Sequence, residues 1–248
     1  MKTLIVIPAR YASTRLPGKP LVSIAGMTLI ERVVRQCEKV RGVSSVVVAT
    51  DHDSIYDEVI SFGGEAMMTK RSHRSGTERA AEVARKKRAS LVINVQGDEP
   101  LLEPRAIELL VDGMKRDRRI GIGTLANPIT NKSDYLDPNV VKVVLDRQNG
   151  ALYFSRAPVP YPRGAPRGFP STAYRHVGIY GYRNEILQKW IRLPPSRLER
   201  LEKLEQLRAL ENGLKIKVFL TKYEAIGVDV PSDVKKVETI LAKRRRSR

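Results

Sequence analysis

The sequence predicts an α/β fold in which helices flank a mostly parallel β-sheet. In the first half of the chain, short β-branched runs alternate with longer amphipathic stretches, and this alternation is typical of right-handed βαβ units. The strand-like runs are almost continuously apolar, which indicates that helices cover both faces of the sheet. With 248 residues, of which 42% are hydrophobic, the chain can bury a core of the size that such a sheet needs.

Each expected element follows from a local pattern. In the first half, strands are expected at 4–7, 46–49 and 91–95, and amphipathic helices at 29–39, 54–61 and 77–87. The pattern then changes, because strand-like runs at 140–146 and 151–156 follow each other without a helix between them. We therefore expect a small antiparallel extension, serving dimerisation, over approximately 139–195.

The last third of the chain adds a loop, a helix and a strand. The loop at 158–170 is rich in Pro and Gly and is a candidate contact with a partner subunit. A helix is expected at 196–211, because Gly213 is a typical C-terminal stop, and a strand is expected at 215–220. No repeat or low-complexity linker interrupts the sequence, so we expect one domain over 1–248 that includes the extension.

Composition narrows the class of protein. The formal charge of +18 raises the possibility of a nucleic-acid partner, but the basic residues are spread among acids and only 6% of residues are aromatic. The dense basic run at 243–248 is more typical of a solvated chain end. Cys37 is the single cysteine, which fits a reducing compartment, and the apolar run before Pro8 is too short for a signal peptide. We expect a cytoplasmic protein without nucleic-acid or membrane partners.

A cation-rich loop follows the first expected strand, at the sheet edge where ligands of such folds bind. It contains Arg10, Arg15 and Lys19 together with hydroxyl-bearing and small residues. Arginines can grip phosphate oxygens with two nitrogens, and a lysine can neutralise a departing pyrophosphate. The loop matches neither the Walker A pattern nor the dinucleotide-binding glycine pattern. It therefore favours triphosphate binding of another type, with a solvated basic loop as the alternative.

Two aspartates are candidate metal ligands. Asp98 follows a buried-type strand, and Asp229 precedes Pro231 where a strand end meets a helix start. Carboxylates far apart in sequence can meet at one site and hold Mg²⁺ through hard oxygen ligands. For Asp229 the pattern leaves a helix-start role equally open. Asp51, Asp53 and Glu99 are interpreted as caps or turn formers.

Six segments carry a resemblance to a known family: IPARYASTRLPGKP (7–20), ATD (49–51), SGTER (75–79), NVQGDEP (94–100), RHVGIYGY (175–182) and LEQLR (204–208). As an ordered set they resemble the 3-deoxy-manno-octulosonate cytidylyltransferases, the CMP-Kdo synthetases. The match runs essentially end to end. The segments at 96–100 and 176–182 distinguish the chain from the related CMP-sialate synthetases.

The resemblance implies a Rossmann-like nucleotidyltransferase fold, a homodimer, and Mg²⁺ held by Asp98 and Asp229. It implies transfer of CMP from CTP to 3-deoxy-D-manno-octulosonate (Kdo), with release of pyrophosphate, for lipopolysaccharide biosynthesis. Lys19, Arg10 and the two aspartates are the expected catalytic residues. The nucleotide is expected along Pro8, Ala9, Arg10, Arg15, Lys19, Ser75, Gly76 and Arg79.

The sugar is expected at Gln96, Arg156, His176, Tyr180, Glu205 and Gln206. These residue types suit an acidic sugar, because arginine pairs with its carboxylate while the other side chains bond to hydroxyls. Without the family, each has a structural explanation, such as a satisfied buried histidine. The alternatives are the same reaction on another acidic sugar, 8-amino-Kdo or a sialic acid, and a nucleic-acid-binding protein.

Overall fold

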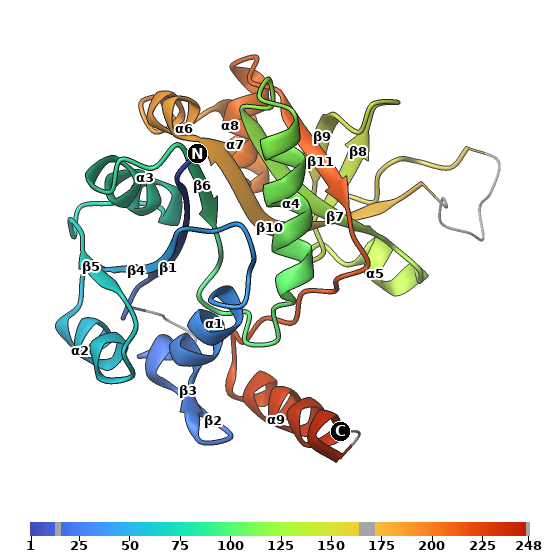
Figure 1. Ribbon diagram of the computed structural model, residues 1–248. Helices are drawn as coiled ribbons and strands as arrows, with labels where there is room; N and C mark the ends of the chain where they lie inside the picture. Colours follow the sequence, from blue (N-terminus) through green and yellow to red (C-terminus); the bar gives the residue numbers. More distant parts are fainter. Residues whose placement is uncertain (13–15, 164–171, 247–248) are drawn as a thin grey trace. The chain divides into compact units, whose positions relative to one another are not determined.

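The computed structural model describes residues 1–12, 16–163 and 172–246 (Figure 1). It divides into two compact units. Unit 1 comprises Met1–Glu108 and Ala225–Arg248, and unit 2 comprises Leu109–Glu224. The chain passes from unit 1 to unit 2 within a single helix, α4 (Pro104–Arg116), so no linker marks this junction. A single domain over 1–248 stays a prediction.

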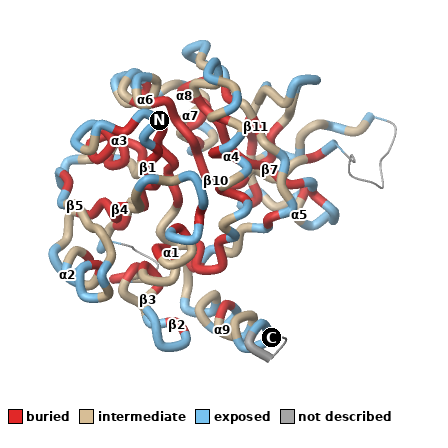
Figure 2. Tube along the Cα trace, in the orientation of Figure 1, coloured by how far each residue is buried: buried red, intermediate tan, exposed pale blue. Residues whose placement is uncertain are grey.

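Unit 1 is built on a parallel sheet with the strand order β6-β1-β4-β5. Its strands are β1 (Thr3–Ala9), β4 (Ser45–Thr50), β5 (Ala66–Met68) and β6 (Leu91–Asn94). Ile5 in β1 pairs with Val46 in β4 on one side and with Ile93 in β6 on the other. Buried residues run along β1 and β4 (Figure 2), which confirms that both faces of this sheet are covered.

Three helices connect these strands at the expected positions: α1 (Leu29–Cys37), α2 (Asp53–Ser61) and α3 (Gly76–Lys86). The hydroxyls of Thr28 and Ser75 accept hydrogen bonds from backbone N–H groups three residues on, and so cap α1 and α3. α1 and α2 connect strands outward from β1 to β5, whereas α3 leads back to β6. Because parallel crossovers are right-handed, α3 lies on the opposite face of the sheet from α1 and α2.

Four further elements lie in unit 1. They are the short helix η1 (Lys19–Leu21), the strands β2 (Ser23–Ile24) and β3 (Met27–Thr28), and the helix α9 (Pro231–Arg246). β2 and β3 form a separate antiparallel pair. Among the helices that the structure describes, none combines the length and apolar character needed to cross a membrane.

Unit 2 contains a mixed sheet made from β7 (Ile122–Pro128), β8 (Lys142–Leu145), β9 (Ala151–Ser155), β10 (Tyr174–Arg183) and β11 (Ile216–Leu220). β7 pairs in parallel with β11 and antiparallel with β10, while β8 pairs antiparallel with both β9 and β10. The expected antiparallel strands are confirmed. A register shift between Val177 and Tyr180 lets both His176 and Tyr180 approach Thr124 on β7.

The single helix expected at 196–211 is wrong. The structure has two helices there, α7 (Arg197–Glu202) and α8 (Gln206–Glu211). Unit 2 also contains the helices α5 (Lys132–Leu136) and α6 (Asn184–Trp190), which precede this region. Lys203 has a φ of 55°, in the left-handed region, and this conformation ends α7. In the sequence, Leu198 and Leu201 before the break and Leu204 after it recur at every third position, so the apolar pattern did not reveal the break.

Candidate active site

The loop after β1 presents Lys19 through a tight turn. Gly18 has a φ of 64°, a left-handed conformation that glycine adopts without a steric penalty. The backbone N–H of Lys19 donates to the Leu16 carbonyl, and the N–H of Leu21 donates to the Gly18 carbonyl. Pro20 follows at the start of η1, where its fixed φ suits the helix. The turn thus fixes the direction in which the Lys19 side chain leaves the backbone.

Lys19 meets both predicted metal ligands. Its ammonium lies 2.8 Å from Asp98 Oδ2 and 3.1 Å from Asp229 Oδ1. Burial alone would lower the pKa of Lys19, but the charges and hydrogen bonds of the two carboxylates raise it above its ordinary value. The side chains of Asp98 and Asp229 are 31% and 46% exposed, so a ligand can reach them from solvent. The Lys19 ammonium therefore contacts two carboxylates that are both accessible to solvent.

Three hydrogen bonds explain how these distant aspartates meet. The N–H of Val228 donates to the Asp98 carbonyl at 2.9 Å, which holds residue 229 beside residue 98. At the start of α9, Asp233 Oδ2 accepts the N–H groups of Asp229 and Val230 at 2.8 and 3.0 Å. Asp233 therefore takes the helix-start role that the sequence left open for Asp229. The Asp229 carboxylate is thereby turned to Lys19.

The three side chains line a cavity of about 310 Å³, together with Pro8, Ala9, Arg10, Ala12, Pro20, Gln96 and Gly97. Gly97 is needed there, because a Cβ on this residue would lie 3.1 Å from the Pro8 carbonyl oxygen. The absence of a side chain at Gly97 thus lets the two backbone segments approach closely. Four of the eight predicted nucleotide residues, Pro8, Ala9, Arg10 and Lys19, line the cavity, as does Gln96, a predicted sugar residue. Arg15 lies outside the described residues.

The residues present fit a magnesium ion. Mg²⁺ in nucleotide enzymes is held by one or two carboxylates, while phosphate oxygens and waters complete the octahedron. Asp98 and Asp229 already converge on one cation, the Lys19 ammonium, which shows that both can face the same positive charge. Within the described parts of the chain, no group of three or more His, Cys, Asp or Glu side chains is placed to hold a metal. Asp98 and Asp229 therefore suit an ion whose other ligands are the phosphate oxygens of a nucleotide and water.

The amino end of α3 lies close to Pro8, one of the residues that line the cavity. Ser75 caps this helix, and Gly76 lies so close to β1 that a Cβ would be 3.2 Å from Pro8 Cγ. Arg10 donates from Nη2 to the carbonyl oxygen of His73 at 3.1 Å. The segment before α3 therefore sets the direction of the Arg10 guanidinium.

Arg79 differs from the other predicted nucleotide residues because its side chain is completely buried. Its Nη2 donates to Asp51 Oδ2 at 2.7 Å, and its Nη1 donates to the hydroxyl of Thr69. Thr69 in turn donates to the Thr50 carbonyl at 2.8 Å. The guanidinium thus ties α3 to the ends of β4 and β5, and Asp51 is an ion-pair partner as well as part of a turn. Contact between Arg79 and a nucleotide stays a prediction.

Five of the six predicted sugar residues lie in unit 2. His176 Nε2 is 3.0 Å from the hydroxyl oxygen of Thr124. The centroid of the His176 ring lies 5.0 Å from that of Phe154 and 5.3 Å from that of Tyr180. Burial in this ring cluster lowers the pKa of His176 to about 3. Burial, reinforced by the charge of Glu205, raises the pKa of Tyr180 well above its ordinary value. Both groups are therefore neutral near pH 7 and act as hydrogen-bonding groups without charge.

Arg156 is held at the end of β9 by backbone contacts. Its Nε donates to the Glu202 carbonyl at 2.8 Å and its Nη1 to the Pro138 carbonyl at 2.9 Å. The carboxylate of Glu202 also accepts the Arg156 backbone N–H at 2.9 Å. Lys142, fully buried, donates to three carbonyl oxygens, including that of Arg156 at 2.7 Å. The position of Arg156 is therefore set by two charged residues that sequence reasoning missed.

A signal for Lys142 was present, because it is a single charge inside the apolar run 140–145. Glu202 gave no such signal, since its carboxylate lies on a helix rich in charge. Of the remaining predicted sugar residues, Glu205 stands at the N-cap position of α8 and Gln206 is its first residue, with a buried side chain. The break at Lys203 places these two residues at a helix start instead of along a helix face.

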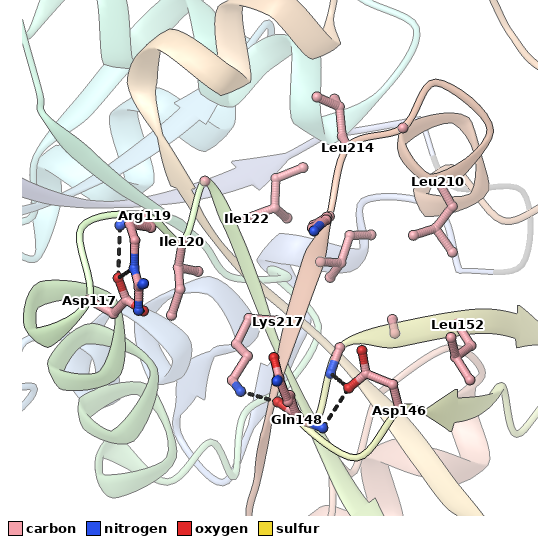
Figure 3. A pocket seen from close by; sticks show the side chains of 16 residues that line it. Asp117, Arg119, Ile120, Ile122, Asp146, Gln148, Leu152, Leu210, Leu214 and Lys217 are labelled. Carbon is pink, nitrogen blue, oxygen red and sulfur yellow. Dashed lines mark hydrogen bonds and ion pairs between the residues drawn. The ribbon is translucent and has the colours of Figure 1, made fainter.

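A larger cavity of about 660 Å³ lies elsewhere in unit 2 (Figure 3). Leucine and isoleucine side chains form part of its wall. Several polar groups on its rim bond to each other: Arg119 donates to Asp117, and Lys217 donates to the Gln148 carbonyl. The described lining of this cavity includes none of the residues predicted for the site, so cavity size does not identify the candidate active site.

Comparisons with known proteins identify the family of this chain. A family model described as Cytidylyltransferase matches residues 4–216. A 3-deoxy-manno-octulosonate cytidylyltransferase from Syntrophotalea carbinolica is 50% identical over 247 residues, covering 97% of this chain and 99% of the relative. The enzyme of that name from Escherichia coli is 44% identical, covering 97% and 96%.

Solved structures extend the comparison to the fold. CMP:2-keto-3-deoxy-manno-octonic acid synthetase complexed with CTP has a TM-score of 0.94 and 44% identity, covering 98% of this chain and 100% of that chain. A cytidylyltransferase from Leptospira borgpetersenii, with a TM-score of 0.66 and 17% identity, supports the fold alone. The predicted Rossmann-like nucleotidyltransferase fold is confirmed. On these grounds the chain belongs to the 3-deoxy-manno-octulosonate cytidylyltransferase family.

Proposed function

We propose that this protein transfers CMP from CTP to Kdo, forming CMP-Kdo and pyrophosphate for lipopolysaccharide biosynthesis. The observation that carries the proposal is the convergence of Lys19, Asp98 and Asp229 at an open cavity at the carboxyl end of β1. That edge is where nucleotides bind in open α/β sheets. A chain of this family with this cluster in place has the charged groups that nucleotidyl transfer needs.

The reaction is an in-line displacement at the α-phosphorus. The anomeric 2-hydroxyl oxygen of Kdo forms a bond to the α-phosphorus and gives its proton to water. The bond between the α-phosphorus and its bridging oxygen breaks, and pyrophosphate leaves on the opposite side. Arg10 and Lys19 neutralise the negative charge that grows on the leaving group. No covalent intermediate with a side chain is required. Catalysis consists mainly of positioning and charge stabilisation.

Mg²⁺ is part of the proposal, with Asp98 and Asp229 as its protein ligands. When bound, it supplies positive charge that acidifies the attacking hydroxyl and stabilises the phosphoryl oxygens. The two aspartates give it a fixed place beside the cavity. Lys19, released from them, is then available to the phosphates.

The sugar half of the reaction rests on neutral hydrogen-bonding groups and one arginine. Arg156 is assigned to the Kdo carboxylate, since a guanidinium and a carboxylate form charge-assisted bonds. His176 and Tyr180 are assigned to hydroxyls, with Glu205, Gln206 and Gln96 completing the set. We also propose, from the family resemblance, that the protein acts as a cytoplasmic homodimer.

A pyrophosphate-release assay with CTP and Mg²⁺ tests the proposal, with Kdo, 8-amino-Kdo, a sialic acid and no sugar compared in parallel. We expect release that depends on Kdo, and CMP-Kdo as the product. Faster release with 8-amino-Kdo or a sialic acid would identify another acidic sugar as the substrate. A folded protein that releases no pyrophosphate with any of these sugars would contradict the assignment.

A further inference from the structure

Two side chains of α3 bind the segment between β5 and α3, residues 69–75. One is Arg79, which binds the ends of β4 and β5 as described above. The other is Glu82, three residues further along the same helix, with a side chain only 6% exposed. A buried carboxylate is costly unless its oxygens are paired, so its partners identify its task.

Glu82 contacts the segment at two points. Its Oε2 lies 2.6 Å from His73 Nε2 and also accepts the backbone N–H of Lys70 at 3.0 Å. Its other oxygen, Oε1, pairs with the Lys86 ammonium at 2.7 Å. Glu82 therefore fixes residues 70–73 at two places, the backbone of Lys70 and the imidazole ring of His73.

The charge state of this contact follows from its surroundings. Burial would raise the pKa of Glu82, but the hydrogen bonds from Lys86, Lys70 and His73 outweigh burial and lower it to about 2. The carboxylate is thus ionised near pH 7 and can only accept. His73 Nε2 must then carry a proton and donate it to this carboxylate, which fixes the orientation of the ring. His73 Nδ1 faces Glu78 Oε2 at 3.7 Å, so both ring edges face acids of α3.

The backbone of His73 makes the connection to the cavity. Its carbonyl oxygen accepts the hydrogen bond from Arg10 Nη2 at 3.1 Å. Arg10 lines the same cavity as Lys19, Asp98 and Asp229. A shift of the His73 main chain would therefore turn the guanidinium that the proposed reaction uses at the phosphates.

We propose that Glu82 is a positioning residue for nucleotide binding: by fixing His73, it holds the carbonyl oxygen that orients Arg10 toward the triphosphate. This inference rests on the role of Arg10 in the proposed function. Glu82 itself contacts Lys70 and His73 and is not among the residues that line the cavity. Its effect on the nucleotide is therefore transmitted through Arg10.

A double-mutant cycle on CTP affinity tests this connection, measured by titration calorimetry with Mg²⁺ in the absence of sugar. Glu82→Gln keeps the shape of the side chain but removes its charge, and we expect it to weaken CTP binding roughly tenfold, the size of one charged hydrogen bond. Arg10→Met should weaken binding at least as much. If Glu82 acts through Arg10, the double variant should bind CTP no more weakly than Arg10→Met alone.

Lys86→Met is the matched control, because Lys86 contacts the same carboxylate through its other oxygen and is 47% exposed. It should leave CTP affinity unchanged. His73→Ala gives an independent test if Glu82→Gln does not fold, since it removes the ring and leaves the carboxylate in place. It should reproduce the tenfold loss, and the loss should disappear in the Arg10→Met background.

Two results would overturn the inference, and they are distinguishable. If Arg10→Met weakens binding but Glu82→Gln and His73→Ala do not, or if their losses add to that of Arg10→Met, then Glu82 does not act through Arg10. If Arg10→Met itself keeps full CTP affinity, the role of Arg10 in the proposed function fails, and this inference fails with it.

Discussion

The predicted site residues of unit 1 and those of unit 2 have opposite chemical characters. In unit 1, Lys19 and two aspartates form an accessible cluster of charges beside an open cavity. In unit 2, His176 and Tyr180 lie among aromatic rings, where burial keeps both side chains neutral. The first arrangement suits a reaction that moves charge between phosphates. The second suits recognition of a sugar by the positions of its hydroxyls.

This difference predicts a division of kinetic roles. Changes in the charge cluster of unit 1 should act mainly on kcat, because their contribution grows with the charge of the transition state. Changes among the neutral groups of unit 2 should act mainly on the KM for Kdo, because they bind substrate and transition state alike. Variants that break this division would show that the two sets of residues do not have separate functions.

The largest effect is expected for Lys19→Met. Removing one group that stabilises developing charge lowers kcat by about 10²–10³-fold. The KM for Kdo should stay within about twofold, since uniform binding of the sugar is untouched. Steady-state pyrophosphate release measures both constants. Lys19→Arg keeps the charge and should retain more activity, and a Lys19→Met enzyme with normal kcat would remove this residue from the chemistry.

The next largest effect is expected for Arg156→Met. Loss of a charged hydrogen bond to the Kdo carboxylate should raise the KM for Kdo by roughly 10–100-fold, with the KM for CTP unchanged. Arg175→Met is the control, because Arg175 faces Asp134 at 3.8 Å and has no assigned role with the sugar. Equal changes in the two variants would argue against carboxylate recognition by Arg156.

A third prediction uses the titration of His176. Its pKa is lowered from 6.5 to about 3, so between these values the unfolded chain binds a proton that the folded chain does not. The contribution of His176 to the free energy of unfolding is therefore fully present above pH 6.5 and is lost progressively as the pH falls toward 3. From pH 6.5 to pH 5 the free energy of unfolding should fall by about 2 kcal/mol from this group.

Urea unfolding at the two pH values measures this change. His176→Phe should lack the His176 contribution and show a correspondingly flatter dependence on pH. If the wild type and the variant lose stability equally over this range, the ring is not held in its neutral form by the fold.

The smallest effect is expected for Tyr180→Phe. One neutral hydrogen bond to a hydroxyl is worth about 0.5–1.5 kcal/mol, so the KM for Kdo should rise roughly 2–12-fold. Tyr182→Phe is the matched control, since its ring stacks on that of Tyr180 at 5.7 Å without an assigned sugar contact. A larger change in Tyr182→Phe than in Tyr180→Phe would reassign the hydroxyl contact.

The elements with strong local signals were predictable from the sequence. The apolar runs of β1, β4 and β6 and the capped helices α1 and α3 appear within a few residues of their expected positions. The break at Lys203 was missed, because a left-handed residue interrupts the backbone without interrupting the apolar spacing. Local patterns therefore located the elements better than they located the interruptions within them.

The candidate site was less predictable, because its contacts are tertiary. That Asp98 and Asp229 share the Lys19 ammonium depends on the backbone bond from Val228, which no sequence spacing reveals. Arg79 was expected along the nucleotide, but its side chain is buried and paired with Asp51. Such pairings depend on which strand ends meet.

The measurement that tests the central claim most directly is the Mg²⁺ dependence of pyrophosphate release in Asp98→Asn, Asp229→Asn and the double variant. If both aspartates hold one ion, each single variant should lose at least about 100-fold in rate at saturating Mg²⁺. The double variant should then be little worse than either single variant, because residues that act as a unit are not additive. Nearly full activity in Asp98→Asn, or independent losses that multiply, would contradict a shared metal at this cluster.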